Sequence, residues 1–303
     1  MVPRDLVIFL VEMRAANERR NARLRQDLLE IGARAAERGI SLVALKGAAD
    51  LLSPLHRRAG RRYIGDLDLL AAETDIAAAW ALLLDLGARK DAIADINLRD
   101  HYHLAPFLSD AWLAQVELHR ALGPDDLSRI LPPQLVLAQA RPSGSPGLRL
   151  PSAPHRLAHL VLHARKDAGA QHRLRISLRD VLEFQGMAAS MRPADVASAA
   201  ALLSTDPARE AMASLEAMRC AIFAPDLWDD LDPRRQEIGV RVLESFGRPG
   251  AQMWREAAHW MRHYLRESVR NPERRHHFLH ETLRPGGLGG WIAHHRHRWR
   301  RIR

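Results

Sequence analysis

Apolar and polar positions along residues 1–119 alternate between helical spacing and strand spacing. The elements expected from this pattern are one or two helices at 5–38, a strand at 40–45, a short helix at 48–55, a basic loop at 57–62, a strand at 63–70, a helix at 75–86, and strands at 101–108 and 112–119. Gly39 and Gly87 follow the last apolar residues of two of these helices, where a glycine commonly ends a helix. Pro54 ends the short helix, and Thr74 is the candidate N-cap of the helix after it.

The pattern changes after residue 140. Residues 141–154 contain RPSGSPG, whose proline and glycine residues are typical of a loop or linker. Helical spacing dominates beyond it, and the expected helices are 155–166, 177–189, 194–204, 207–223, 233–246 and 251–269. We therefore expect an α+β fold: a small mixed-sheet domain with N-terminal helices at 1–140, an all-helical domain at 141–283, and a basic tail at 284–303.

The composition indicates a chain with a sizeable hydrophobic core and no disulfide bonds. The 303 residues are 47% hydrophobic, and Cys220 is the single cysteine, which excludes a disulfide framework and a cysteine-based zinc site. The apolar run near the N-terminus is broken by Glu12 and Arg14, so it reads neither as a signal peptide nor as a membrane span. We expect a cytoplasmic protein with no membrane insertion.

The formal net charge of +9 favours polyanionic partners such as nucleic acid or nucleotides. The alternative is that an arginine-rich composition reflects a GC-rich genome, because the arginines are spread along the chain. The tail at 284–303 combines glycines, arginines and two tryptophans. It fits either a solvated end or an arm that contacts RNA or another anionic partner.

Asp66 and Asp68 stand on a predicted strand among apolar neighbours. Side chains two apart on a strand point to the same face, so the two carboxylates would repel each other. A divalent cation resolves the conflict, and Mg²⁺ is usually held by one or two carboxylates and substrate phosphates. The spacing therefore predicts a metal site at Asp66 and Asp68. An isolated pair of aspartates is also common at surfaces and helix caps, so further residues are needed to support a metal site.

A third acid comes from the strand at 112–119. Alternation there places Val116 and Leu118 on one face and Glu117 and His119 on the other. Glu117 would complete a two-metal site with the aspartates, and His119 is the better-placed histidine for orienting an acceptor or acting as a base.

Phosphate-binding residues are expected between the first two strands, just after the strand at 40–45 and just before the strand at 63–70. Gly47 lies where a strand turns into a helix and permits close backbone approach, while Lys46 and Arg62 can neutralise a triphosphate. The plain alternative for Gly47 is an ordinary turn. No GxxxxGK[ST] pattern occurs, which excludes a P-loop.

Together, LVALKGAADLL, RRYIGDLDLL, YHLAPF and VELH resemble the uncharacterised nucleotidyltransferase family of the polymerase-β-like superfamily. Its pattern is LKG, then R-x-x-G-D-[IL]-D-L-L, then an acidic [VL]-E-[LI]-H strand. The matching positions here are Arg62, Gly65, Asp66, Asp68, Glu117 and His119. A later segment, HRLAHLVLHARKDAGAQHRLRISLRDVLEF, resembles the family's helical region, and the likeness covers about residues 40–185.

The resemblance implies Mg²⁺- or Mn²⁺-dependent transfer of a nucleoside monophosphate from an NTP, with ATP the first choice. Asp66, Asp68 and Glu117 would hold metal, and Lys46, Gly47, Arg62 and Gly65 would bind the nucleotide. The resemblance does not name the acceptor; the classes expected are a small molecule, a peptide or a protein, with natural-product modification as one setting. One departure is Ala48, which stands where the wider superfamily has a serine or glycine, so no hydroxyl is offered to phosphate there.

Two alternatives remain open from the sequence. A toxin-like nucleotidyltransferase acting on RNA would suit the basic charge, and a non-catalytic nucleotide-binding module would keep the fold without activity. The presence of all three motif acids favours an enzyme.

Three histidines, His155, His159 and His163, form a stripe at helical spacing. HLVLH lacks the glutamate of HExxH, so a zinc site is disfavoured against packing or lining a cleft. Downstream, Arg175 and Arg179 either reach phosphates or pair with nearby acids at the surface.

Overall fold

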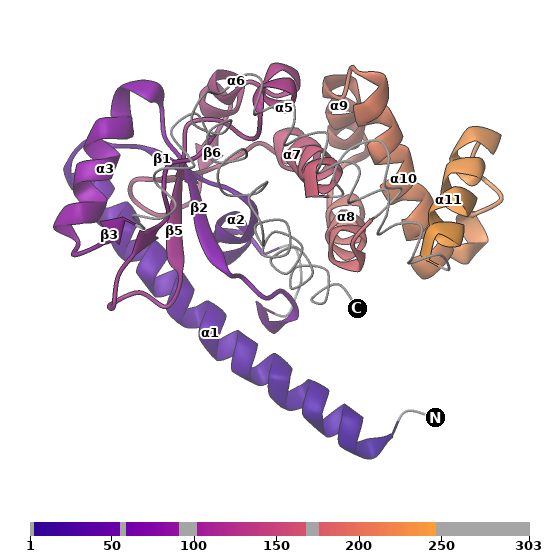
Figure 1. The fold of residues 1–303 in the computed structure, drawn as a ribbon, viewed down its shortest axis with the longest axis horizontal. Helices are drawn as coiled ribbons and strands as arrows, with labels where there is room; N and C mark the ends of the chain where they lie inside the picture. Colours follow the sequence, from indigo (N-terminus) through magenta and orange to yellow (C-terminus); the bar gives the residue numbers. More distant parts are fainter. Residues whose placement is uncertain (1–2, 55–58, 91–101, 168–175, 247–303) are drawn as a thin grey trace, which may run out of the picture.

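The computed structural model of the chain describes residues 3–54, 59–90, 102–167 and 176–246. A mixed sheet with its covering helices lies beside a group of helices from the later part of the chain, which confirms the α+β fold (Figure 1). The helices are α1 (Arg4–Glu37), α2 (Lys46–Leu52), α3 (Ile76–Asp85), α5 (Asp125–Ile130), α6 (Pro133–Ala138), α7 (Ala153–Asp167), α8 (Leu178–Ser190), α9 (Pro193–Leu202), α10 (Asp206–Phe223) and α11 (Pro233–Phe246). The strands are β1 (Leu42–Ala44), β2 (Asp66–Leu70), β3 (Arg89–Lys90), β4 (Phe107–Leu108), β5 (Gln115–His119), β6 (Arg141–Pro142) and β7 (Leu148–Leu150). Short 3₁₀ turns lie at η1 (Ala59–Arg61), η2 (Glu73–Asp75) and η3 (Pro225–Leu227).

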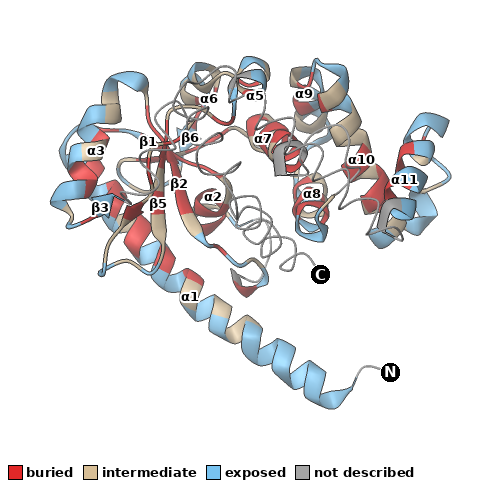
Figure 2. Ribbon diagram, in the orientation of Figure 1, coloured by how far each residue is buried: buried red, intermediate tan, exposed pale blue. Residues whose placement is uncertain are grey.

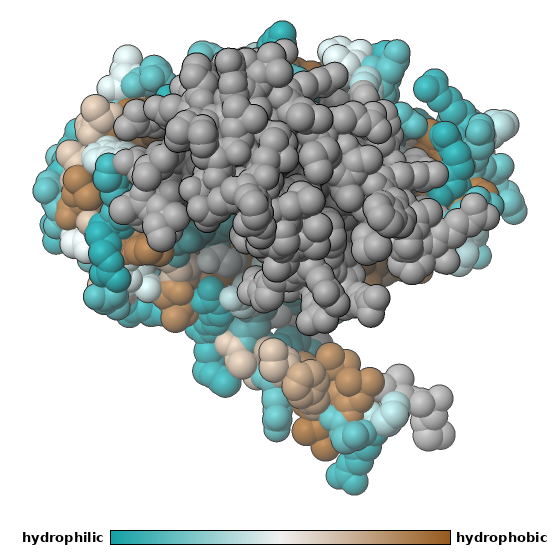
Figure 3. Space-filling model, in the orientation of Figure 1, coloured by the Kyte–Doolittle hydropathy of each residue, from teal (hydrophilic) through white to brown (hydrophobic). Residues whose placement is uncertain are grey.

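Helix α1 is one continuous helix that ends at the predicted glycine. Gly39 adopts a φ of +69°, and the amide of Ile40 donates back to the carbonyl of Ala35, so the last turn is closed. The C-terminal half of α1 packs on the sheet and residues 14–20 lie against η1 and the loop after it, whereas the exposed residues 4–13 project away from the body (Figures 1 and 2). Apolar side chains gather on that projecting part (Figure 3), and the large ones with substantial exposure are Leu6, Val7, Ile8, Phe9, Leu10, Val11 and Met13.

The sheet has the order β3-β4-β5-β2-β1-β7-β6. Its two central strands, β2 and β5, run parallel, and this pairing sets Asp68 opposite Glu117 and Leu70 opposite His119. Alternation separates two cores: Leu67 and Leu69 face the core under α1, α2 and α3, while Leu70 faces the core shared with the later helices. The polar positions of β2 and β5 therefore share the face that looks toward those helices.

The later helices build their own core around α7 and α10. Buried leucines, valines and alanines of α7 pack against Val181 and Phe184 of α8 and Leu215 and Met218 of α10. Within the described residues, helices are either too short or too polar to cross a membrane.

Several expectations need correction. Residues 141–154, expected to be a linker, contribute β6 and β7, and β7 pairs in parallel with β1. The boundary drawn at residue 140 thus cuts through the sheet. These strands are so short that their sequence carries no alternation, and only pairing defines them.

Thr74 does not cap α3, because it lies inside η2, and Asp75 takes the N-cap position without a side-chain hydrogen bond. The sequence pattern also did not predict β3, α5 and α6, because elements of six residues or fewer show little periodicity. The expected helix at 251–269 and the tail at 284–303 lie outside the described residues.

Gly147 provides a stability test of the contact between α1 and the sheet. Its φ is +66°, and a Cβ added there would lie 2.0 Å from the backbone oxygen of Gly32. Gly147→Ala should therefore destabilise the fold by about 2 to 4 kcal/mol in urea denaturation, from strain and displaced backbone together. Gly144→Ala is the control, because φ is +84° there but no atom lies within 4 Å of the added Cβ. Equal losses for both variants would show that the close approach contributes nothing.

Candidate active site

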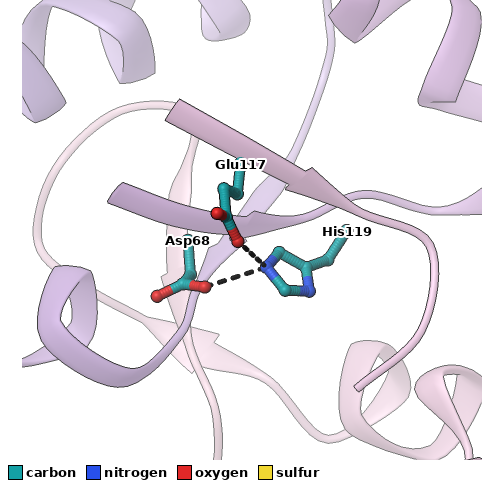
Figure 4. A group of neighbouring side chains, drawn as sticks. All are labelled: Asp68, Glu117 and His119. Atoms are coloured by element: carbon teal, nitrogen blue, oxygen red, sulfur yellow. Dashed lines mark hydrogen bonds and ion pairs between the residues drawn. The ribbon is translucent and has the colours of Figure 1, made fainter. Parts of the chain in front are cut away.

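Asp68 and Glu117 meet at the centre of the sheet. They are register partners on β2 and β5, so their carboxylates project from the same face (Figure 4). His119 joins them one alternate position further along β5, and ligand atoms of these three residues all lie within 4.8 Å of one another. Val116 and Leu118 are fully buried on the opposite face, as the strand alternation predicts.

Two basic side chains converge on one oxygen of Asp68. Lys46 Nζ lies 2.7 Å from Asp68 Oδ1, and His119 Nε2 lies 2.9 Å from the same atom. Burial opposes the charge of Asp68, but these two partners hold its pKa well below its usual range. The other oxygen, Oδ2, is buried and has no hydrogen-bond partner among the described residues.

His119 has an acceptor near each of its ring nitrogens. Nδ1 lies 3.3 Å from the carbonyl oxygen of Ala121, and Nε2 also approaches Glu117 Oε2 at 3.7 Å. Burial disfavours the imidazolium, yet the hydrogen bonds to Asp68 and Glu117 outweigh it and raise the pKa of His119. In the reverse direction, burial raises the pKa of Glu117 but the hydrogen bond from His119 leaves it below its usual range.

Asp66 behaves differently from its neighbour two positions on. Burial, followed by repulsion from Asp68 and Glu117, raises the pKa of Asp66 to about 6. The negative charge of three clustered carboxylates is thus only partly compensated by Lys46 and His119.

The turn from β1 into α2 is strained at the lysine that reaches Asp68. Among the described residues other than glycine, positive φ occurs at Lys46, with a value of +42°. This left-handed conformation costs a side-chain-bearing residue about 1 to 2 kcal/mol, and such strain concentrates at functional sites.

These residues open onto a polar cleft of about 340 Å³ between the sheet and the helices α7 and α8. It is lined from the sheet side by Lys46, Gly47, Arg62, Tyr63, Ile64, Gly65, Asp66, Asp68, Tyr102, His103 and Glu117, and from the helical side by Pro151, Arg156, His159, Leu160, His163, Arg179, Asp180, Glu183 and Met187. Paired carboxylates and cations in one cleft are suited to holding a phosphate-bearing substrate.

A family model described as "Uncharacterised nucleotidyltransferase" matches residues 1–209, which is more than half of the chain. The chain belongs to this family. No curated protein matches it.

Every residue expected at the site except His119 lines the cleft, and His119 lies beneath it against Asp68. Their roles remain predictions. Arg62 differs from expectation in its surroundings, because its guanidinium already contacts two carboxylates, those of Asp50 and Glu183. Ala48 is fully buried in α2, so nothing on its side chain faces a phosphate.

The histidine stripe on α7 contributes to packing and lines the cleft. His159 and His163 face the cleft with their ring centroids 6.3 Å apart, and His155 is buried at the start of α7. Within the described ranges, the grouping of metal-type ligands is that of Asp68, Glu117 and His119, and the stripe forms no second one.

Four further residues belong to the site although the sequence analysis assigned them no functional role: His103, Glu183, Asp50 and Arg156. His103 Nε2 lies 3.7 Å from Glu117 Oε2, so Glu117 stands between two histidines. Glu183, an acid close to Arg179 in the sequence, is buried, and it joins the ion network of Asp50 and Arg156 through Arg62. A faint signal existed for two of them: YHL, which contains His103, precedes a strand, and RDVLEF places Glu183 among apolar residues of a helix.

His159 gives the fold a testable acid sensitivity. Its Nε2 lies 3.2 Å from the carbonyl oxygen of Leu122. Burial, then the charges of Lys46 and His119, lowers the pKa of His159 from 6.5 to about 3. Between those values the unfolded chain binds a proton that the folded chain does not, so stability falls as the pH drops through that window.

His159→Gln keeps an amide donor for Leu122 but removes the titration. From pH 6.5 to pH 5, the wild type should lose about 2 kcal/mol more unfolding free energy than this variant, measured in urea. Equal losses would show that His159 titrates normally in the folded protein.

Proposed function

We propose that the cleft binds a nucleoside triphosphate, ATP in the first instance, with Mg²⁺ or Mn²⁺, and that the protein transfers the nucleoside monophosphate to an acceptor. The observation that carries this proposal is the apposition of Asp68 and Glu117 on paired parallel strands, with Asp66 and Lys46 in the same cleft. Membership of a nucleotidyltransferase family supports it.

The residues present fit a divalent cation. Magnesium and manganese prefer oxygen ligands, and Asp66, Asp68 and Glu117 offer carboxylate oxygens from one face of the sheet. Asp68 Oδ2 is buried without a hydrogen-bond partner in the described part of the chain, which is costly unless something positive meets it. The raised pKa of Asp66 points the same way, because a cation would relieve the repulsion that raises it.

Asp66, Asp68 and Glu117 would hold the metal. When bound, a divalent ion would neutralise charge on the phosphate oxygens and favour the deprotonated, nucleophilic form of the acceptor. Lys46 supplies a further positive charge beside these oxygens, and Gly47 and Gly65 leave the backbone free of side chains along the cleft floor. His119, buried against Asp68, fixes which oxygen of that carboxylate faces the cleft.

The proposed reaction is a displacement at the α-phosphorus. An oxygen or nitrogen of the acceptor forms a bond to that phosphorus, the bond from it to the oxygen bridging to the β-phosphate breaks, and pyrophosphate leaves with the bridging oxygen. The acceptor loses its proton to solvent or to a cleft base. Since Ala48 offers no hydroxyl, Lys46 is the main side-chain donor to the phosphates on this side.

Parallel reactions with [α-³²P]ATP and [γ-³²P]ATP test the reaction class. With Mg²⁺, a panel of amino and hydroxy compounds, peptides and RNA is expected to include an acceptor that takes label from the α position only, with equimolar pyrophosphate. Label from the γ position would instead show phosphoryl transfer and overturn the proposal.

The same panel separates the acceptor classes. A small molecule, peptide or protein as acceptor fits the main proposal, whereas labelled RNA whose yield falls steeply with salt would favour the RNA-directed alternative suggested by the net charge of +9. A non-catalytic module would bind ATP with Mg²⁺ but label nothing.

A further inference from the structure

The loop between η1 and β2 carries Gly65 and leads into Asp66, and helix α1 holds its start. Asn17 Nδ2 donates to the carbonyl oxygens of Gly60 and Arg62, each at 2.8 Å. Asn21 Nδ2 donates to the same carbonyl of Arg62 at 2.8 Å. Two amides from successive turns of one helix thus fix a single backbone group before the metal-binding strand begins.

Further contacts on α1 reinforce this hold. A Cβ on Gly60 would lie 2.4 Å from the backbone oxygen of Arg14, so the loop lies directly against the helix backbone. The guanidinium of Arg20 stacks over the ring of Tyr63 at 4.9 Å. The hold therefore extends over residues 60–63.

Helix α2 confines the same loop from the other side. Ile64 is buried, and its side chain lies so close to Gly47 that a Cβ on that glycine would be 2.9 Å from Ile64 Cγ2. Because Gly47 follows Lys46, the position of this loop also sets the base of the lysine that reaches Asp68.

The side chain of Arg62 is already satisfied by protein carboxylates. It donates to Asp50 of α2 and lies 3.0 Å from Glu183 of α8, while Asp50 also binds Arg156 of α7. These two arginines and two acids balance in charge and are all largely buried. Such a compensated cluster is poorly suited to receiving a phosphate but well suited to tying elements together.

We propose that Asn17, Asn21 and Arg62 are positioning residues: α1 grips the backbone of Arg62, and Arg62 ties the loop before Asp66 to α2 and α8. This inference rests on the proposed metal site. Residues that orient metal ligands typically change metal affinity about 10- to 100-fold when replaced. A phosphate-binding Arg62 would instead act only when a nucleotide is present.

Mn²⁺ binding without nucleotide, followed by electron paramagnetic resonance, separates these two roles. Asn21→Leu and Arg62→Lys should each weaken Mn²⁺ binding about tenfold, although neither side chain is a metal ligand. The matched controls are Gln26→Leu on the exposed face of α1 and Arg61→Lys in the adjacent exposed position, and both should bind Mn²⁺ as the wild type does. Circular dichroism establishes that each variant is folded, and Asn17→Ser serves if Asn21→Leu does not fold.

Unchanged Mn²⁺ affinity in folded Asn21 (or Asn17) and Arg62 variants would overturn the positioning role. If Arg62→Lys then weakened only the binding of α,β-methylene-ATP, Arg62 would be a phosphate contact instead. Failure of the underlying metal site has a different signature, because wild-type protein itself would then bind no Mn²⁺, or bind it equally well after Asp68→Asn.

Discussion

Replacing Asp68 with asparagine should lower Mg²⁺-dependent nucleotidyl transfer at least about 1,000-fold, which corresponds to about 4 kcal/mol of transition-state stabilisation. Asparagine keeps the shape of the side chain but removes the charge that holds Lys46 and His119 and would bind the metal. It also leaves these two cations facing a neutral group. The rate is measured as α-labelled product or pyrophosphate release with the acceptor identified from the panel.

Asp85→Asn is the matched control for Asp68→Asn. Asp85 is a carboxylate at the end of α3, where it pairs with Arg38 at the surface. This variant should keep wild-type activity, and its melting curve shows what loss of an exposed acid does alone. Activity within tenfold of wild type in a folded Asp68→Asn protein would contradict the assignment of Asp68 to the site.

Replacing Asp50 with alanine should cause the largest loss of stability, about 3 to 5 kcal/mol in urea denaturation. Asp50 is buried between Arg62 and Arg156, which come from a loop beside α1 and from α7. Without it, two guanidinium groups in a largely buried setting retain one nearby carboxylate, that of Glu183. An uncompensated buried charge is far more costly than an absent surface pair.

Asp85→Asn again supplies the comparison, since it breaks the exposed ion pair with Arg38 and should cost no more than about 1 kcal/mol. If Asp50→Ala cost equally little, the network of Asp50, Arg62 and Arg156 would be hydrated and would not fasten α7 to the sheet domain.

The centre of the site could be predicted from the sequence because strand alternation is local. Two-residue periodicity alone places Asp66 and Asp68 on one face of their strand, and it places Glu117 and His119 on the face opposite Val116 and Leu118. The register that sets Asp68 opposite Glu117 joins strands distant in sequence, and the motif pattern predicted only that Glu117 belongs to the same site.

The partners of these residues could not be predicted in the same way. Asp50 of α2 and Glu183 of α8 contact Arg62, and Arg156 of α7 joins them through Asp50. No sequence spacing encodes such a meeting of three helices. Arg62 therefore looked like a cation available to phosphate, whereas the fold surrounds it with acids. The strands β6 and β7 were not predicted for a related reason, because a strand of two or three residues is defined by its pairing with a neighbouring strand.

The central claim is that the cleft binds a nucleotide through a metal held by Asp66, Asp68 and Glu117. Isothermal titration of the wild-type protein with α,β-methylene-ATP, with Mg²⁺ and then with EDTA, tests it most directly. The account predicts saturable binding at one site with Mg²⁺ and loss of that binding with EDTA. Binding of equal strength under both conditions, or none under either, would contradict it.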